Sequence, residues 1–370
     1  MRIERGFEVT YKVIQWATGG VGRAAIEGIL DHPELELVGC WVHSEEKDGR
    51  DVGELIGREP IGVRATRDVD ALLALGADCV CYSPIVANPQ EVCRILEAGI
   101  DIVTPLGWVY PKRIDTADVE AACAAGRSTL HGTGIHPGGI TERFPLMVSG
   151  LSRAITHVRA EEFSDIRTYA AAGVVSEMML FGKTPDEART SPMGKLLAGG
   201  FFQSIDMVAD AIGVTLDDEK RTTHSIAIAT QPIDSPIGVI EPGRVAAQRF
   251  CWQGLVDGQP VITAAVNWHM GDEGFEPVPG ADPDAPWTWG ELGPRFEVGI
   301  SGDPDTLLTF KGWHPHSVAE GLVRNEGIVV TAMHCVSAIP YVCQADAGIK
   351  TYLDLPLIAG RIAPELAKRA

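Results

Sequence analysis

The sequence is poor in positive charge and has no long apolar segment. Its 370 residues include 31 Lys and Arg against 50 Asp and Glu, a formal net charge of −19 at pH 7. Nucleic acids and anionic membranes both attract basic surfaces, so neither is an expected partner. No apolar run is long enough for a transmembrane helix, and residues 1–7 contain no apolar signal-peptide core. We therefore expect a cytoplasmic globular protein.

The eight cysteines form no metal-binding pattern. They include no C-x-x-C pair and no spacing with a matching pair of histidines. Most lie in apolar segments, where a free thiol behaves as a small hydrophobic side chain. We predict reduced core cysteines and no metal site.

The first third of the chain alternates apolar segments with helical ones. Asn88 provides an N-cap, Pro89 suits the first helical position and Glu91 the third, so a helix is expected to begin here. Apolar strands separated by helices indicate a parallel sheet covered on both faces, as in a doubly wound Rossmann domain. Strands are expected at 9–16, 35–42, 79–82, 100–103 and 128–131, and helices from the glycine loop to about 32, at 67–75, 89–98 and 116–125.

From about residue 153 the pattern changes to longer strands joined by turns. Asp257-Gly258 separates two β-rich runs at 244–256 and 260–270, which is a strong hairpin signal. This pattern predicts a second, α+β domain with a mostly antiparallel sheet. Its other expected elements are strands at 154–163 and 222–230, a second hairpin at 296–311, and helix near 186–212.

The chain ends in another helical segment, 327–339, followed by Pro340 and an apolar run to Gly360. A terminal helix of this kind commonly packs back on the nucleotide domain. We therefore predict a discontinuous Rossmann domain, residues 1–145 and 328–370, with residues 146–327 forming the substrate and dimerisation domain.

A glycine-rich loop follows the first predicted strand. Glycines there allow a tight turn and close approach of the backbone to a pyrophosphate, while the helix N-terminus supplies free N–H groups. Trp16 replaces the first glycine of the usual spacing, and Gly19 and Gly22 keep the rest. A tight turn without a ligand is the alternative. The residues expected to hold a dinucleotide here are Gly19, Gly20, Val21, Gly22 and Arg23.

The end of the second strand bears on the choice of cofactor. His43, Ser44 and Lys47 are able to hold the 2′-phosphate of NADP, whereas Glu45 is able to bind the ribose of NAD. A solvated mixed-charge loop is the alternative. The pattern slightly favours NADP, with use of both cofactors expected. Further cofactor contacts are expected at the ends of later strands, at Ser83, Pro84, Thr104, Pro105 and Gly134.

Residues 271–294 have the composition of a long loop, with five prolines, six acids and no Lys or Arg. Trp287 and Trp289 are able to close over an apolar ligand or a partner subunit. An acidic surface insertion is the plainer interpretation of this segment.

Four segments together resemble the dihydrodipicolinate reductase-like oxidoreductases, in particular the branch of 2,4-diaminopentanoate dehydrogenase and the native amine dehydrogenases. They are residues 11–26, 43–55, 131–146 and 331–340. The resemblance implies a Rossmann domain with an α+β substrate domain, a homodimer, and NAD(P)-dependent hydride transfer at a C=N or C=O carbon.

The chain also departs from these patterns. It has a single His136 where dihydrodipicolinate reductases carry a paired-His motif with a nearby Lys, so reduction in the lysine pathway is not expected. The amine branch has Asn at this position. That branch also carries a catalytic Glu shortly before a Tyr-Pro pair. Here Tyr110-Pro111 is present, but residues 106–109 contain no acid.

Four residues are therefore candidates for proton transfer. His136 follows the last Rossmann strand and has a suitable ordinary pKa, although it also fits a role as a hydrogen-bond donor to the cofactor amide or to a backbone carbonyl. Glu142 lies near the same edge, where it also suits a helix dipole. Tyr110 has a hydroxyl, but a buried structural role is common for tyrosine. Glu161 and Glu162 alternate on one strand, so one of them must point inward or toward a partner, and a buried carboxylate there would have a raised pKa and be able to replace the missing Glu. Of the two, we select Glu162.

These residues predict an NAD(P)-dependent oxidoreductase acting on a small to medium, mainly apolar ketone, imine or amine. The expected cleft wall is aromatic and apolar (Trp108, Tyr110, Tyr169, Met178, Met179, Phe181). The alternatives are a carbonyl reductase that does not use ammonia, and a catalytically inactive dinucleotide-binding sensor.

Overall fold

The computed structural model describes residues 10–169, 171–278, 293–311, 319–321, 325–363 and 366. The chain divides into two compact units, residues 1–138 with 328–370, and residues 139–327. Within the described parts, no helix combines the length and the apolar character needed to cross a membrane. Trp287 and Trp289 lie outside the described residues.

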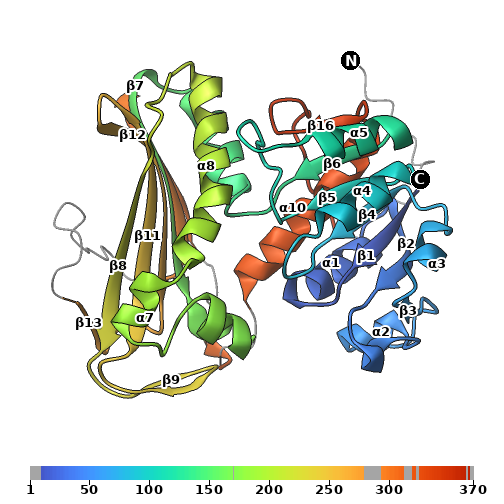
Figure 1. Cartoon of the computed structure of the whole chain (residues 1–370), viewed down its shortest axis with the longest axis horizontal. Helices are drawn as coiled ribbons and strands as arrows, with labels where there is room; N and C mark the ends of the chain where they lie inside the picture. The colour runs from blue at the N-terminus through green and yellow to red at the C-terminus, as the bar shows by residue number, and fades with distance from the viewer. Residues whose placement is uncertain are drawn as a thin grey trace. The chain divides into compact units, whose positions relative to one another are not determined.

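The first unit is built on a seven-stranded, wholly parallel sheet (Figure 1). The strand order is β16-β6-β5-β4-β1-β2-β3, so the chain reverses its winding direction between β1 and β4, as in Rossmann folds. The strands are β1 (Tyr11–Trp16), β2 (Leu35–Trp41), β3 (Ala65–Thr66), β4 (Cys79–Tyr82), β5 (Asp101–Thr104), β6 (Thr129–Gly132) and β16 (Gly348–Lys350).

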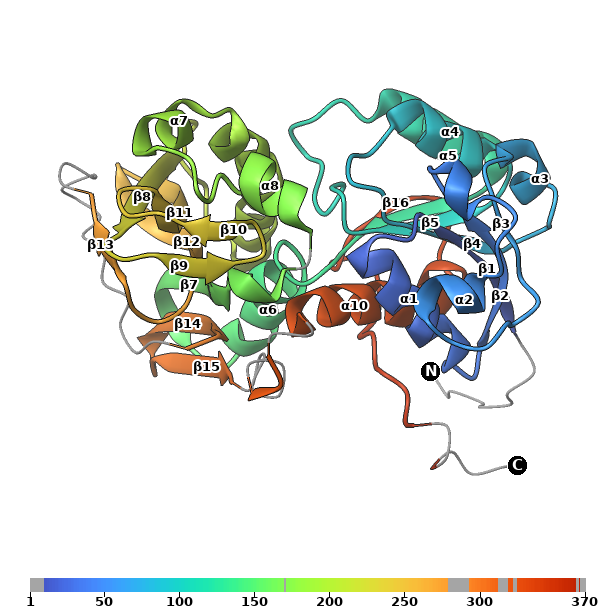
Figure 2. The same cartoon turned by 90° about the horizontal axis from the view of Figure 1, so that it is seen from below.

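Helices cover both faces of this sheet (Figure 2). Alternate strand residues point to opposite faces, so Val13 packs with one helical layer and Ile14 with the other. The layer on Val13 holds α1 (Gly20–Leu30), α2 (Val52–Ile56) and α10 (Glu326–Val342); the layer on Ile14 holds α3 (Val69–Leu73), α4 (Pro89–Glu97) and α5 (Ala117–Gly126). A 3₁₀ turn, η1 (Glu45–Lys47), follows β2.

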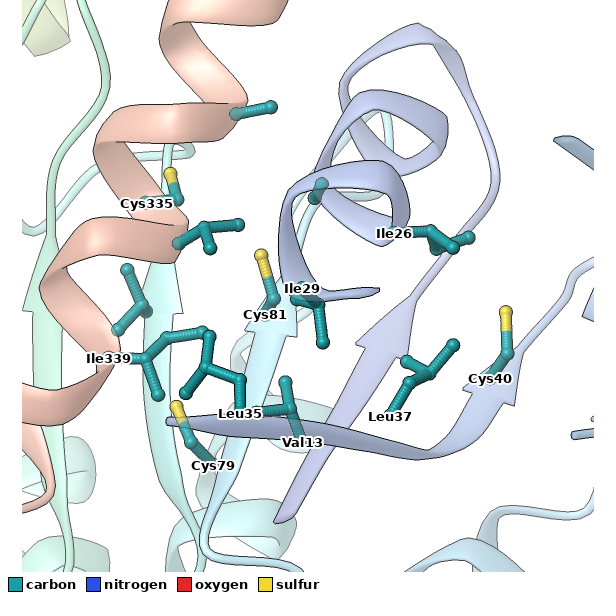
Figure 3. Close-up of a cluster of buried hydrophobic side chains, with 14 of the residues drawn as sticks. Val13, Ile26, Ile29, Leu35, Leu37, Cys40, Cys79, Cys81, Cys335 and Ile339 are labelled. Carbon is teal, nitrogen blue, oxygen red and sulfur yellow. The ribbon is translucent and has the colours of Figure 1, made fainter. Parts of the chain in front are cut away.

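The C-terminal segment completes the first unit. Figure 3 shows Cys335 and Ile339 of α10 among the buried side chains of α1 and the parallel strands. The sequence predicted an end of this helix before Pro340, but α10 runs through Pro340 to Val342. Strand β16, which was not predicted, adds to the sheet beside β6. All eight cysteines are free thiols, six of them buried.

The predicted helix start at Asn88 is confirmed. The Asn88 side chain accepts hydrogen bonds from the backbone N–H groups of Gln90 and Glu91, and Pro89 occupies the first turn. These contacts satisfy N–H groups that have no partner within the helix.

The second unit contains a seven-stranded sheet in the order β13-β8-β11-β12-β7-β14-β15. All neighbours are antiparallel except β12 and β7, which confirms the predicted mostly antiparallel sheet. The strands are β7 (Arg153–Asp165), β8 (Arg221–Ala229), β11 (Val245–Val256), β12 (Gln259–His269), β13 (Phe275–Pro277), β14 (Arg295–Asp303) and β15 (Thr306–Phe310), with a separate hairpin of β9 (Ile233–Ser235) and β10 (Gly238–Ile240).

The predicted β11–β12 hairpin is also confirmed. Asp257 and Gly258 both have positive φ, 51° and 73°, which suits the tight turn between Val256 and Gln259. Part of the segment predicted as a loop, Phe275–Pro277, instead forms strand β13 against β8.

One face of the second sheet carries the helices of this unit. Long helix α8 (Met193–Ile212) packs on apolar side chains such as Phe250, Trp252 and Ile262 (Figure 1). The opposite face is mainly polar. The other helical elements are π-helical turns η2 (Gly139–Arg143) and η4 (Val174–Met178), 3₁₀ turn η3 (Ile166–Thr168), α6 (Phe144–Ser149) and α7 (Pro185–Thr190).

Candidate active site

The glycine loop brings helix α1 very close to the end of β1. A Cβ placed on Gly22 would lie 2.1 Å from the carbonyl oxygen of Ala17, so only glycine fits this approach. A Cβ on Gly19 would meet no atom within 4 Å. Gly22 is therefore required for packing, whereas Gly19 leaves open space beside the helix N-terminus.

This N-terminus suits an anionic ligand. Gly19 is the N-cap of α1 and provides no side-chain cap, and the first turn contains no acid. The N–H groups and the positive end of the helix dipole favour a phosphate at such a position. The predicted residues Gly19, Gly20, Val21 and Gly22, together with Arg23, thus form a cradle that fits the pyrophosphate of a dinucleotide.

Trp16 occupies the position of the missing first glycine without blocking the turn. Its buried indole stacks on Trp41, with ring centroids 5.3 Å apart, and its Nε1 donates to Glu91 Oε2 at 3.0 Å. The positive φ expected of a glycine falls instead on Ala17, at 76°. The turn therefore keeps its shape although the first glycine is absent.

The loop after β2 places a cation next to the glycine loop. Lys47 Nζ donates to Thr18 Oγ1 at 3.2 Å. Glu45 forms an exposed ion pair with Arg67 at 3.0 Å. Arg67 was not predicted as a site residue. It follows β3, and the pairing of β2 with β3 brings it to this edge.

The other two predicted residues of this loop are close by. His43 is exposed and contacts the edge of Trp41, with centroids 6.1 Å apart. The Ser44 hydroxyl is buried and has no hydrogen-bond partner among the described residues. Both remain candidates for the ribose or its 2′-phosphate.

The predicted contacts after β4 and β5 have side chains used inside the fold. Ser83 Oγ donates to Trp16 O at 3.3 Å, and Thr104 Oγ1 accepts from the Leu106 N–H at 3.2 Å. Pro84 and Pro105 follow these two strands directly. Ser83 and Thr104 therefore shape the strand ends through their hydroxyl groups.

The end of β6 is held by the C-terminal segment. His334 of α10 hydrogen-bonds through Nδ1 to the carbonyl of Gly134, the predicted cofactor contact, and lies 3.1 Å from the Tyr352 hydroxyl. Thr133 contacts the same two side chains. This cluster fixes the backbone immediately before His136.

His136 has a different protonation behaviour from the one expected. Both of its ring nitrogens are buried, and burial lowers the pKa of His136 to about 3. Because desolvation disfavours the imidazolium, the imidazole is neutral at pH 7. A role as a neutral hydrogen-bonding group is the part of the prediction that remains.

The remaining candidates of the first unit lie after β5. Tyr110 is half-buried, and its carbonyl accepts a hydrogen bond from the Lys112 N–H at 2.8 Å. Trp108, two residues earlier, is buried with a positive φ of 52°. Neither supplies the acid that residues 106–109 lack.

Glu142 is fully buried in the second unit. It lies in η2, where Thr141 Oγ1 donates to its Oε2 at 2.8 Å and the hydroxyl of Ser204 on α8 contacts its Oε1. Glu142 thus lies in the first turn of a helical segment, as expected, and two hydroxyl groups hold its carboxyl against α8.

Glu161 and Glu162 point to opposite faces of β7, as strand geometry requires. On the polar face, Glu161 accepts hydrogen bonds from Arg159, Arg249 and Asn267. On the helix-covered face, burial raises the pKa of Glu162, although hydrogen bonds from Ser164 and Trp268, at 2.6 and 3.1 Å, oppose the rise. This direction is the one expected of a carboxyl removed from water, and the role of Glu162 in catalysis stays a prediction.

Trp268, whose indole donates to Glu162, packs against two apolar clusters. Tyr169 packs with Met179 and Phe181 in one of them. Burial, with the Glu162 charge adding to it, raises the pKa of Tyr169 to about 12. Among the described residues, no three His, Cys, Asp or Glu side chains gather as a metal ion would require.

The Rossmann sheet, its phosphate cradle and the attached α+β unit define a nicotinamide-dependent oxidoreductase. Comparisons with known proteins agree. The model for the dihydrodipicolinate reductase N-terminus matches residues 13–87, and that for the 2,4-diaminopentanoate dehydrogenase C-terminal domain matches residues 140–268. An amine dehydrogenase of Streptomyces virginiae is 32% identical over 358 residues, covering 93% of this chain and 96% of that protein.

The chain belongs to the dihydrodipicolinate reductase-like oxidoreductases, in the branch that contains the amine dehydrogenases and 2,4-diaminopentanoate dehydrogenase. The 2,4-diaminopentanoate dehydrogenase of Acetoanaerobium sticklandii is 25% identical over 361 residues, covering 94% of this chain and 93% of that protein. The structure of an amine dehydrogenase from Mycobacterium smegmatis has the same fold, with a TM-score of 0.72 at 21% identity, covering 97% of this chain and 99% of that one.

We expect substitutions of Gly22 and Gly19 to have different effects on folding stability. Gly22→Ala forces a Cβ against Ala17 O, so we expect a loss of about 1–3 kcal/mol of stability together with weaker cofactor binding. Gly19→Ala has room and is expected to change stability by less than about 0.5 kcal/mol, while its methyl group obstructs a bound phosphate. Thermal melts and calorimetric titration with NADPH measure both. Equal melting temperatures for the two variants would contradict the packing argument.

Glu162→Gln is expected to change stability in a pH-dependent way. A raised carboxyl pKa means that the folded state binds the proton more tightly, so wild-type stability is complete at low pH and falls as pH rises through the folded pKa. The neutral amide avoids this loss and still accepts from Ser164 and Trp268. Melts from pH 4 to 8 should show an advantage of the variant only at the higher pH values; an advantage independent of pH would exclude a titrating Glu162.

Proposed function

We propose that the protein is an NAD(P)-dependent amine dehydrogenase for a small to medium, mainly apolar substrate. In the reductive direction a ketone, ammonia, a hydride and a proton give a primary amine and water. Nicotinamide supplies the hydride when bound. The observation that carries the proposal is the half-buried Glu162 carboxyl, held by Ser164 and Trp268 and with a raised pKa, in a chain whose relatives include amine dehydrogenases.

Glu162 suits the acid–base step that residues 106–109 leave without an acid. A carboxyl with a raised pKa stays protonated to higher pH than an exposed glutamate, so it is able to give a proton to the hydroxyl that leaves as water. In the preceding step, in which the nitrogen of ammonia bonds to the carbonyl carbon, the carboxylate form is able to take a proton from that nitrogen and pass it to the carbonyl oxygen, which becomes the hydroxyl. We assign to residues 139–327 the binding of substrate, and to residues 1–138 with 328–370 the binding of the dinucleotide.

The apolar surroundings of Glu162 support the substrate class. Tyr169, Met179 and Phe181 pack in one cluster beside Trp268, and such a lining favours an alkyl or aryl group over a dicarboxylate. Neutral His136 is assigned a hydrogen bond to the substrate or the cofactor amide, while Glu142 and Tyr110 are assigned to shaping the site.

We also propose that the protein uses NADP in preference to NAD and accepts both. Lys47 lies against Thr18 of the glycine loop, and Ser44 offers a hydroxyl beside it. Glu45, the acid that would bind the NAD ribose, is paired with Arg67. A phosphate gains from the two nearby cations, whereas a ribose hydroxyl gains little.

The assay follows NADPH and NADH oxidation with a panel of apolar ketones, with and without a high concentration of ammonia. Turnover that depends on ammonia, is faster with NADPH, and falls about 100-fold in Glu162→Gln is expected. Turnover without ammonia would replace the proposal with carbonyl reduction. Tight cofactor binding with no turnover on any ketone would indicate a non-catalytic dinucleotide sensor.

We propose that the partner of this chain is a second copy, bound through the polar face of the second sheet. This face carries charges of both signs: Glu297 pairs with Arg159 and Arg295, and Glu161 with Arg159 and Arg249. A mixed-charge face is able to meet itself across a twofold axis, because each acid then finds a base.

Neighbouring threonines on β8 test this interface with a matched pair of variants. Thr223 is on the polar face and Thr222 on the other, and both lie in the same strand. Light scattering after size exclusion should give twice the chain mass for the wild type and Thr222→Arg, and a shift toward the monomer mass for Thr223→Arg. A monomeric wild type, or dimers in both variants, would refute this interface.

A further inference from the structure

The first strand contains a polar residue where the pattern calls for an apolar one. Gln15 lies between Ile14 and Trp16 in β1, a central strand with helices on both faces, and it is completely buried. Burial of an amide is unfavourable unless its polar atoms find partners. The position therefore needs an explanation that apolar packing does not provide.

The side-chain amide of Gln15 converges on the glycine loop. Its Nε2 lies 3.0 Å from Ala17 O, 3.2 Å from Trp16 O and 2.8 Å from Ser83 Oγ. Two N–H groups serve these three acceptors, one given to Ser83 and one shared between the carbonyls. The amide thus joins the turn after β1 to the loop after β4.

The carbonyl groups that accept from Gln15 Nε2 belong to the turn that forms the phosphate cradle. Ala17 has the positive φ of the turn, and its carbonyl oxygen is the atom against which Gly22 packs. A Cβ on Gly22 would also lie 3.0 Å from Gln15 Nε2. The amide therefore lies at the point where α1 comes closest to the end of β1. Movement of this amide would shift the first turn of α1.

The other end of the amide is less well satisfied. Oε1 of Gln15 is buried and has no hydrogen-bond partner among the described residues. A buried acceptor of this kind lowers stability. The Nε2 donors of Gln15 therefore stabilise the glycine loop, whereas its unpaired Oε1 lowers the stability of the fold. This combination is typical of a residue whose role is to hold the loop in shape.

We propose that Gln15 is a positioning residue for the dinucleotide: its amide holds the glycine loop in the shape that receives the pyrophosphate. The inference rests on the proposed use of a nicotinamide dinucleotide and does not depend on which substrate is reduced. The proposal predicts that removal of the amide weakens cofactor binding with little change in folding stability, because the donors and the unpaired acceptor are lost together.

The main test replaces Gln15 with methionine, which has a similar shape and no amide. We expect Gln15→Met to melt within about 2 °C of the wild type, because loss of the donors is offset by loss of the buried acceptor. The NADPH dissociation constant, measured by calorimetry, should rise about tenfold. The kcat at saturating NADPH should stay within about twofold, since Gln15 touches no reacting atom.

Two further variants make the test specific. Gln248 of β11 is also completely buried, with Nε2 donating to Met179 O at 2.5 Å, so Gln248→Met is the same substitution in the other unit and should leave NADPH affinity unchanged. Ser83→Ala should weaken NADPH binding in the wild type and have a smaller effect in Gln15→Met, because the Gln15–Ser83 bond is then already absent.

A folded Gln15→Met with wild-type NADPH affinity would overturn the inference, as would an equal loss of affinity in Gln248→Met. The proposed function fails separately, when the wild type binds NADPH but turns over no ketone. In that case the affinities of the Gln15 variants still decide the role of the amide.

Discussion

The approach of α1 to the end of β1 is the constraint on which the dinucleotide site depends. Gly22 packs directly against the carbonyl oxygen of Ala17, with no room for a Cβ. This contact directs the N-terminus of α1 at the edge of the sheet where the parallel strands end. The phosphate cradle, the cation of Lys47 on Thr18 and the Gln15 amide are all arranged around the same turn.

A second constraint is that buried hydrogen-bond donors and acceptors need partners, and it applies to the polar groups at the ends of the parallel strands. Ser83, Thr104 and the Thr133–His334–Tyr352 cluster satisfy backbone or side-chain groups in the same edge. Their hydroxyl and imidazole groups are thereby committed to shaping the loops. The backbone of those loops, rather than these side chains, is then left to meet a ligand.

In the second unit, the adjacent residues Glu161 and Glu162 of β7 have carboxyl groups in very different environments. Glu161 lies among arginines on the polar face, and Glu162 accepts hydrogen bonds from Ser164 and Trp268 on the face covered by helices. The first suits an ion-pair network and the second suits proton transfer. Under the proposed function, Glu162 would take the role of the acid that is absent before Tyr110.

The sequence by itself determined the elements that depend on local patterns. Apolar runs and spacing located the strands, Asn88 and Pro89 located the start of α4, and Asp257-Gly258 located the hairpin, because caps and tight turns are satisfied by neighbouring residues. The glycine loop and the family resemblance were equally visible. Of the individual site residues, sequence spacing showed only that Glu161 and Glu162 must face opposite ways.

Tertiary structure decided the properties that require distant segments to meet. The low pKa of His136 follows from burial, and the ion pair of Glu45 with Arg67 follows from the pairing of β2 with β3. Strand β16 joins the sheet beside β6, more than 200 residues earlier in the chain. The role of Gln15 was not visible in the sequence, because its partners include Ser83, which follows another strand. Burial and long-range hydrogen bonds arise only once the chain is packed, and they decide the charge and the position of each group in the site.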